Sequence, residues 1–283
     1  MVDLHSHSVF SDGTYTPAEL IREAEAIGLT ALTLCDHNTA KGLPDFFAAA
    51  KGKRVTPIPA AELSAEFEGS LIHIIAMFLP ESQYDTIDSY MEDSSREDQI
   101  AVQKMIEHLG TVGYPLDLNS IPRNALGRIA FPNIAVAMAE AGYGADRYEA
   151  RKLLSALWKE AKPLMPKVPL PNGVETVRFI RSIGAVPVLA HPYLNLTEEQ
   201  LPRFLKEAVA AGLQGMEVYY YSFDEATTAK AEILAKRFGL LPSGGSDFHG
   251  AARPASRLGV GKGNLQIPDS VLFQLKEGSA CHG

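Results

Sequence analysis

The sequence predicts an α/β protein, a distorted seven-stranded β/α barrel that carries a helical insertion. Four helix-like segments each end at a glycine, and each is followed within a few residues by a short apolar run typical of a strand. Three more such runs bring the total to about seven, more than a small open sheet usually needs. Periodicity alone does not exclude an open doubly wound sheet.

Capping residues indicate where the four helices begin. Thr16 and Glu19 form a capping-box pattern, and Pro17 suits the first helical position. A glycine should end each helix, because glycine adopts the left-handed conformation at little cost. Pro202 can delay the start of the third helix. The expected helices are 16–28, 172–184, 197–212 and 222–239, and the expected strands are 2–5, 31–35, 55–62, 71–78, 186–190, 215–219 and 241–245.

Residues 92–170 differ from the rest of the chain, because they contain helical stripes and no convincing strand. A proline-rich stretch, 163–171, follows the helices and resembles a stiff extended connector. We therefore expect residues 1–91 and 171–283 to form the barrel and residues 92–170 to form a helical cap over one end of it. The two apolar stripes are Val102, Met105, Ile106 and Leu109, and Leu153, Leu154, Leu157 and Trp158.

Composition excludes several classes of protein. The 283 residues are 46% hydrophobic and 21% charged, which suits a large globular core and excludes a disordered chain. The formal charge of −8 provides no basic field for duplex DNA or an anionic membrane, so a phosphorylated substrate must be attracted locally. Cys35 and Cys281 form no disulfide framework or thiolate zinc motif, and no signal peptide is evident, so we expect a cytoplasmic protein.

Histidines and carboxylates gather at the predicted strand ends. Six of the eight histidines are expected at or just beyond the carboxyl end of a strand, and five carboxylates occupy similar places. In parallel β/α folds these ends converge on one rim, which carries the active site. The residues are His5, His7, His37, His73, His191 and His249, with Asp12, Asp36, Glu62, Glu217 and Asp247.

Imidazole and carboxylate ligands without thiolate suit Mn, Zn or Fe, and there are too many for one ion, so two or three divalent metals are implied. Asp36 could instead orient His37 or its loop, and Glu217 could support a ligand or touch substrate. Cys35 fits a buried strand residue. His108 and His282 are expected in solvent, away from this site.

At this point the motifs resemble those of the PHP (polymerase and histidinol phosphatase) family of metal-dependent phosphoesterases. The resemblance covers about residues 2–90 and 170–262 and implies a distorted seven-stranded barrel. The motifs are Asp3-Leu4-His5-Ser6-His7-Ser8, Ser11-Asp12-Gly13, Cys35-Asp36-His37-Asn38-Thr39, Glu62, His73, Leu189-Ala190-His191-Pro192 and Gly245-Ser246-Asp247-Phe248-His249.

The resemblance also implies a set of metal ligands. His5, His7, Glu62 and Asp247 would hold one ion, and Asp12, His37 and His249 a second. Glu62 would bridge to a third ion held by His73 and His191.

Within the family, the helical insertion resembles a subgroup that hydrolyses nucleoside 3′,5′-bisphosphates, some members of which trim the 5′ ends of short RNA. That subgroup commonly has an Arg-x-His element where this chain has Phe131-Pro132-Asn133. Arg128 could serve from one turn earlier, and Asn133 could cap the helix instead of touching substrate.

The expected reaction is attack of a metal-bridged hydroxide on a phosphate ester, releasing the 3′-phosphate of the bisphosphate. His191 or His249 could protonate the leaving group, Arg128 and Lys159 could bind a second phosphate, and a base could stack on Tyr219. The partner is then a small nucleotide or a short oligoribonucleotide. Histidinol phosphate is an alternative substrate, and C–N hydrolysis as in amidohydrolases is another, although no predicted strand carries the lysine that many of those enzymes use.

Overall fold

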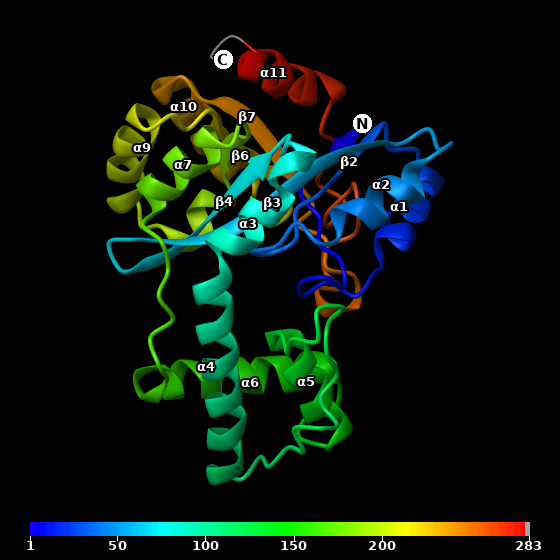
Figure 1. The fold of residues 1–283 in the computed structure, drawn as a ribbon, viewed down its shortest axis with the longest axis vertical. Helices are drawn as coiled ribbons and strands as arrows, with labels where there is room; N and C mark the ends of the chain where they lie inside the picture. The colour runs from blue at the N-terminus through cyan, green and yellow to red at the C-terminus, as the bar shows by residue number, and fades with distance from the viewer. Residues whose placement is uncertain (281–283) are drawn as a thin grey trace.

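Seven strands arranged in chain order form a nearly closed barrel (Figure 1). The structure is a computed structural model that describes residues 1–280, so Cys281 and His282 lie outside the described residues. The open sheet is ruled out, because the segments that directly follow the first and last strands meet in the parallel Ser6–Phe248 bridge. The strands are β1 (Val2–Asp3), β2 (Ala31–Leu34), β3 (Thr56–Phe67), β4 (Ser70–Met77), β5 (Val186–Leu189), β6 (Gly215–Tyr220) and β7 (Leu241–Gly245).

Glycine allows the first and last strands to close the barrel. The amide of Leu4 donates to the carbonyl oxygen of Gly244 over 3.2 Å. A Cβ added to Gly245 would lie 2.3 Å from the Cβ of His5, so only glycine permits this approach. The close packing presses the β7 segment against the residues that follow β1.

One strand departs from the expected alternation of helix and parallel strand. β4 is antiparallel to both β3 and β5, while the other neighbouring strands are parallel. β3 extends to Phe67, beyond its expected end at Glu62, and a tight turn at Glu68 and Gly69, both with positive φ, leads directly into β4. No helix therefore separates these two strands, and β4 begins at the end of the barrel where β3 and β5 finish.

Helices cover the outside of the barrel and close one of its ends. Between the helices and the strands lies an apolar layer that includes Leu20, Phe46 and Phe204. Inside the barrel, Leu4 and Val188 pack with Leu275, so apolar residues fill the end covered by α11. The polar site must then lie at the other end. The outer helices are α1 (Pro17–Ala26), α2 (Leu43–Ala50), α3 (Tyr84–Tyr90), α7 (Gly173–Ser182), α8 (Pro192–Asn195), α9 (Gln200–Ala210), α10 (Glu225–Phe238) and α11 (Asp269–Ala280).

The capping predictions are confirmed for two helices and corrected for the others. Thr16 caps α1 in a complete capping box, and Asn172 accepts the first amides of α7. Thr197 and Gln200 bond reciprocally, but α9 begins only at Gln200. The prediction of Ser222 for α10 is wrong, because Asp224 accepts the amide of Thr227 and is the actual cap.

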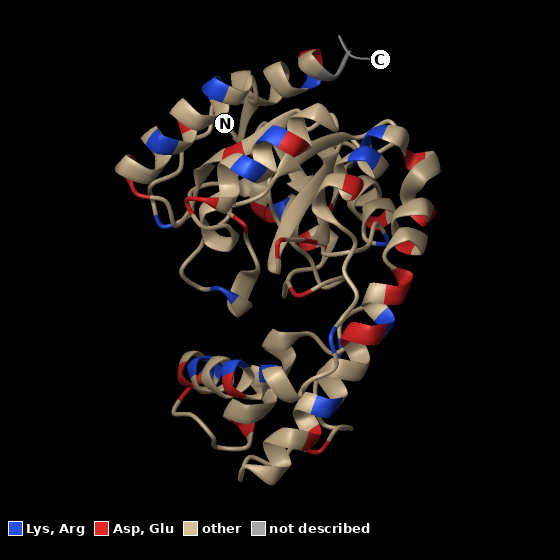
Figure 2. Ribbon diagram, turned by 90° about the vertical axis from the view of Figure 1, so that its left-hand side faces the viewer, with Lys and Arg blue, Asp and Glu red and all other residues tan. Residues whose placement is uncertain are grey.

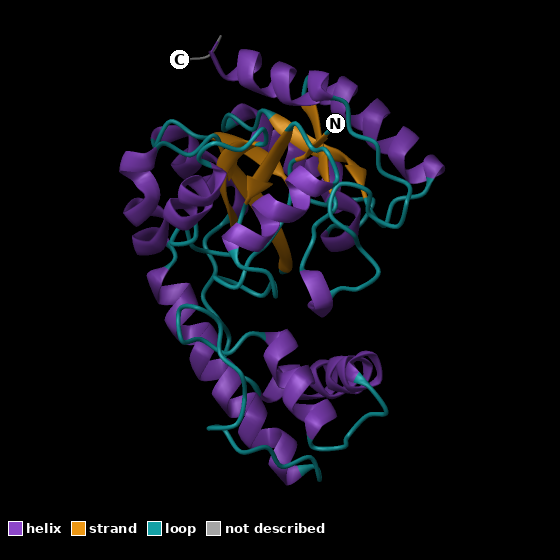
Figure 3. Cartoon of the chain, turned by 90° about the vertical axis from the view of Figure 1, so that its right-hand side faces the viewer, coloured by secondary structure: helices purple, strands orange, loops and turns teal. Residues whose placement is uncertain are grey.

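Residues 92–170 contain three α-helices and no strand, as the sequence predicts (Figure 3). These are α4 (Glu92–Thr111), α5 (Phe131–Glu140) and α6 (Arg147–Ala161). They enclose an apolar core of their own, which includes the whole first stripe and Leu154 from the second. The division at residues 92 and 170 stays a prediction. Within residues 1–280, no helix is long and apolar enough to cross a membrane.

The insertion lies opposite α11, facing the polar end of the barrel (Figures 1 and 3). The amide of Ala125 donates to the carbonyl oxygen of Val9 over 2.7 Å, and the Asn124 side chain donates to that of Ser11 over 3.0 Å. These bonds fasten the insertion to the loop that follows β1.

Candidate metal centre

The nine residues expected as metal ligands come together at the barrel mouth that faces the insertion. The loops after β1, β2, β5 and β7 supply seven of them, while Glu62 lies within β3 and His73 near the start of β4. The expectation that His73 ends its strand is wrong. It still reaches the mouth, because β4 runs antiparallel to its neighbours. The nine are His5, His7, Asp12, His37, Glu62, His73, His191, Asp247 and His249.

Four buried ligand atoms form the first group. The Nε2 atoms of His5 and His7 are 3.0 Å apart, and each lies 3.2 Å from Oε2 of Glu62. Asp247 Oδ1 lies 3.1 Å from the Nε2 of His7 and 3.4 Å from that of His5. Ligands about 2.0–2.2 Å from one ion are separated by roughly these distances.

The other carboxylate oxygen of Glu62 belongs to a second group. Its Oε1 lies 3.0 Å from His191 Nε2 and 3.2 Å from His73 Nδ1. The two histidine nitrogens are themselves 3.4 Å apart. Glu62 therefore faces two separate clusters of nitrogen ligands, one with each oxygen.

A third group surrounds Asp12. Its Oδ1 lies 3.1 Å from His249 Nε2 and 3.9 Å from both His37 Nε2 and His7 Nδ1. Asp12 Oδ1, His7 Nδ1 and His249 Nε2 are buried and have no hydrogen-bond partner. Buried polar atoms normally have a hydrogen-bond partner, and these three lie close together without one. A cation bound between them would satisfy all three. The donor set and its orphaned atoms thus suit divalent metals.

The electrostatics of the cluster lead to the same conclusion. Burial alone would raise the pKa of the Glu62 carboxyl, but His5, His37 and His73 hold it well below its usual range. Burial would likewise lower the pKa of His5, yet Cys35, Glu217 and Glu62 keep it well above its usual value. The pKa values of His7 and His191 are raised as well, whereas burial lowers those of His37 and His249, so the positive charge favoured by the carboxylates falls on His5, His7 and His191. Bound metal ions would replace that positive charge.

Glu217 and Asp36 hold the ligands in place. Glu217 accepts hydrogen bonds from His5 Nδ1 over 2.8 Å and from the His191 amide over 2.6 Å, which leaves His5 Nε2 as a lone pair. Asp36 accepts from the hydroxyls of Ser8 and Ser11, each over 2.6 Å, and so orders the loop that carries Asp12. Of the roles left open for these carboxylates, the structure favours support of the ligands.

Two groups that the sequence did not indicate secure Asp247. The Tyr220 hydroxyl donates to Asp247 Oδ2 over 2.6 Å, and the Arg253 guanidinium pairs with the same oxygen. Oδ1 therefore stays directed at His5 and His7. Asn195 is a third missed residue, since its Oδ1 lies 2.8 Å from His191 Nδ1. No sequence motif marks these three positions.

The structure does not bring Tyr219 into the site. Its hydroxyl donates to Glu232 on α10, outside the barrel, over 3.2 Å. The cause is an irregularity in β6 between Glu217 and Tyr219, which makes Tyr220 the next inward-facing side chain. The predicted stacking role of Tyr219 is therefore wrong.

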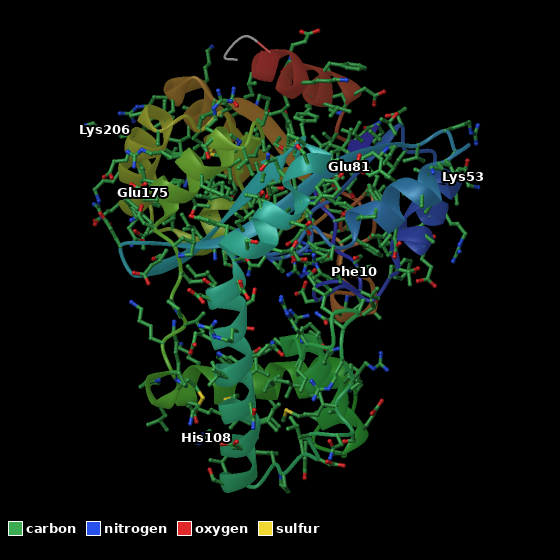
Figure 4. The ribbon with its side chains drawn as sticks, in the orientation of Figure 1. Phe10, Lys53, Glu81, His108, Glu175 and Lys206 are labelled. Atoms are coloured by element: carbon green, nitrogen blue, oxygen red, sulfur yellow. The ribbon has the colours of Figure 1, made fainter. Side chains whose placement is uncertain are left out.

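The other predicted substrate contacts divide into two cases. Arg128 lines a cavity of about 170 Å³ beside Asp12 and His37, together with Phe10 and Phe131. Figure 4 labels Phe10 where the barrel faces the insertion, and His108 lies on the insertion away from it. Lys159 is exposed near the end of α6 and lines neither of the two cavities at the mouth. The structure therefore does not support its predicted contact with a second phosphate.

Asn133 and the two proposed proton donors have other partners. Asn133 Oδ1 accepts the Ala130 amide over 2.8 Å and so caps α5. His249 Nδ1 donates to the Asp247 carbonyl oxygen over 2.8 Å, which leaves Nε2 as a lone pair facing Asp12. Both ring nitrogens of His191 have partners: Nδ1 faces Asn195 Oδ1, and Nε2 faces Glu62 Oε1. The geometry of both histidines suits ligands better than acids.

Strained backbone marks the site. Asn38, His191 and Asp247 all have positive φ, of 57°, 26° and 49°, although none is glycine. All three lie directly beside or within the ligand set. Such strain persists where the surrounding contacts hold it, which is typical of functional sites.

The fold and the site together define a metal-dependent hydrolase built on an α/β barrel. Residues 3–124 match the model of the PHP domain. The chain also superimposes on the crystal structure of a protein from Bifidobacterium adolescentis described as a metal-dependent phosphoesterase. The TM-score is 0.83 at 26% identity, covering 98% of this chain and 96% of that one. Residues 3–124 therefore resemble a PHP domain, and the whole chain shares the fold of a protein described as a metal-dependent phosphoesterase.

Curated relatives act on several phosphate esters. A 5′-3′ exoribonuclease of Haemophilus influenzae is 29% identical over 95% of this chain and 96% of its own. A phosphoribosyl 1,2-cyclic phosphate 1,2-diphosphodiesterase of Eggerthella lenta is 27% identical, covering 88% and 94%. A 3′,5′-nucleoside bisphosphate phosphatase of Chromobacterium violaceum is 28% identical, covering 88% and 87%. These similarities support phosphoester hydrolysis as the class of reaction.

Proposed function

We propose that the protein removes the 3′-phosphate from nucleoside 3′,5′-bisphosphates and also degrades short RNA from its 5′ end. The observation that carries this proposal is the placement of the insertion. It is bonded to the loop that carries Asp12 and leaves cavities directly beside the ligand cluster. A substrate larger than a single phosphate can therefore touch both the barrel mouth and the insertion. The relatives from Haemophilus influenzae and Chromobacterium violaceum support the same two activities.

We assign one metal to His5, His7, Glu62 and Asp247, and another to Asp12, His37 and His249. A third would lie at His73 and His191, with Glu62 shared between two ions. When bound, divalent ions supply Lewis acidity toward phosphoryl oxygens and lower the pKa of water.

The chain's own residues position the ligands and the substrate. Glu217 orients His5, and Tyr220 with Arg253 directs Asp247 toward the first group. Arg128 lines the cavity beside His37, where its guanidinium can bind the substrate and the rings of Phe10 and Phe131 offer apolar faces. The protein thereby holds the ester in one orientation against the metal centre.

A phosphate-release assay with Mn²⁺ tests the proposal. Adenosine 3′,5′-bisphosphate is compared with histidinol phosphate, a phosphotyrosine peptide and phosphoribosyl 1,2-cyclic phosphate, and a 5′-phosphorylated oligoribonucleotide is followed on a gel. The proposal expects the highest kcat/KM for the bisphosphate and stepwise shortening of the RNA from its 5′ end. Preference for any of the other three substrates would overturn the nucleotide assignment while leaving the family intact.

C–N hydrolysis finds no support in the barrel. None of the strands described in residues 1–280 contains a lysine, so the carbamylated lysine expected for many such enzymes has no strand position here.

A further inference from the structure

A second cavity, of about 100 Å³, lies between α5, α6 and the turn that follows His249. Asp12, Ala252 and Pro254 line it from the barrel, while Arg147 and Arg151 line it from α6. Asp12 also faces His249 at the ligand cluster, so this cavity borders the metal centre directly. Figure 2 shows Lys and Arg along α6, the insertion helix that supplies this wall.

Arg151 is placed to bind an anion. Its guanidinium donates to the carbonyl oxygen of Ala252, which draws α6 to the barrel and fixes the direction of the side chain. Within residues 1–280 it forms no ion pair with a carboxylate. Arg151 is half-buried and lines the cavity, so its other N–H groups can donate to an anion placed there.

A second guanidinium lies close to Arg151. Burial, and next to it the charge of Arg253, lowers the pKa of Arg151, while Arg253 itself pairs with Asp247. Two like charges that approach in a partly buried place repel each other, and an anion beside them would remove that cost. Because the whole chain is acidic, such a local pair of cations is notable.

We propose that this cavity binds the phosphate of the substrate that does not react, with Arg151 as its main contact and Arg147 beside it. The proposal rests on the proposed function: the 5′-phosphate of a nucleoside 3′,5′-bisphosphate occupies the cavity while its 3′-phosphate lies at the metal centre. A phosphomonoester dianion matches the forked donors of arginine. The second phosphate is therefore recognised by Arg151, two helical turns before the predicted Lys159.

Arg151→Gln tests this assignment. With Mn²⁺, kcat/KM is measured for adenosine 3′,5′-bisphosphate and for adenosine 3′-monophosphate, which lacks the phosphate in question. We expect a loss of about 10- to 100-fold for the bisphosphate, mainly through KM, and no change for the monophosphate. Arg151→Lys keeps the positive charge but not the paired N–H donors of the guanidinium, so its loss of kcat/KM for the bisphosphate should be smaller. Lys152→Gln, the neighbouring exposed cation on α6, is the control and should leave both substrates unaffected.

Two outcomes of the kinetic comparison would overturn the proposal. Equal losses on both substrates would show that Arg151 acts through the metal centre or the fold, and no loss on either would show that the cavity does not bind the phosphate. If the wild-type protein hydrolyses neither compound, the proposed function is wrong, and calorimetric titration with adenosine 5′-monophosphate still tests the cavity. Binding to wild type that weakens at least about tenfold in Arg151→Gln supports the anion site. No binding, or equal binding, rejects it.

Discussion

Glu62 Oε1 lies 3.0 Å from Nε2 of His191, a residue 129 positions later in the chain. The same carboxylate directs Oε2 at His5 and His7, on the opposite side. A single side chain thus joins two groups of ligands that come from both halves of the barrel. Glu62 is fully buried in the middle of β3, so one strand position sets the place of both ligand groups.

Glu62→Gln should therefore disturb more than one ion. The amide supplies only one oxygen and no charge, so one of the two groups would face an NH₂ group instead of a ligand. We expect the metal content, measured by plasma mass spectrometry, to fall by at least about one ion per chain, and phosphate release to fall at least about 100-fold. Glu66→Gln, on the same strand, is the matched control. Full metal content in Glu62→Gln would refute the shared position.

Glu217→Gln should weaken metal binding without removing a ligand. Glu217 fixes the proton of His5 on Nδ1. Without the negative charge of Glu217, the Nε2 atom of His5 is a weaker ligand for a metal ion. We expect the affinity for Mn²⁺, measured by competition with a fluorescent chelator, to fall about 10- to 100-fold. Glu232→Gln, an exposed carboxylate on α10, should bind Mn²⁺ like the wild type. An unchanged affinity in Glu217→Gln would show that His5 needs no such support.

The neighbouring tyrosines of β6 provide a paired test of the strand irregularity. Tyr220→Phe removes the hydroxyl that donates to Asp247, so kcat/KM should fall about tenfold. Tyr219→Phe removes only a bond to Glu232 on the outside and should leave kcat/KM unchanged. Steady-state kinetics on one phosphate ester suffices. The reverse pattern would mean that Tyr219 faces the site.

The ligand cluster also predicts how stability depends on pH. In the metal-free protein the pKa of His5, His7 and His191 is raised above the ordinary value. Their contribution to stability is fully present below about pH 6.5 and is lost as the pH rises through the raised pKa values. Glu62 and Asp247 have lowered pKa values, so their contribution is instead lost as the pH falls into the acid range.

Bound cations replace the histidine protons, so the alkaline loss should disappear in the metal-loaded protein. Thermal melting over a pH series measures the stability of the metal-free protein in EDTA and of the metal-loaded protein in Mn²⁺. We expect the melting temperature of the EDTA-treated protein alone to decline above neutral pH. Parallel curves in the two conditions would show that the histidines do not interact with metal.

Much of this architecture could be predicted, because local signals and the global fold agree. Asn172 and Thr16 are caps whose side chains bond as their sequence patterns suggest. The alternation of His5 and His7 on one extended segment, and their position after a strand, predicted that both would reach the mouth. Parallel strands gather their carboxyl ends at one edge, so residues as distant as Asp12 and His249 could be expected together.

Other features depend on contacts that no local pattern encodes. The antiparallel course of β4 follows from a hairpin turn at Glu68 and Gly69, and apolar periodicity is the same in either direction. The irregularity that exchanges Tyr219 for Tyr220 arises from pairing with β7. Arg151 and Ala252 are hydrogen-bonded only because the insertion folds back onto the mouth, and the sequence between them gives no measure of that approach.

Anomalous diffraction from crystals soaked in Mn²⁺ and phosphate tests the central claim most directly. We expect peaks at the manganese edge within the group of His5, His7, Glu62 and Asp247, and within at least one of the other two groups, with phosphate density beside them. Peaks confined to other parts of the surface, or none at a concentration that supports turnover, would contradict a metal centre built from these residues.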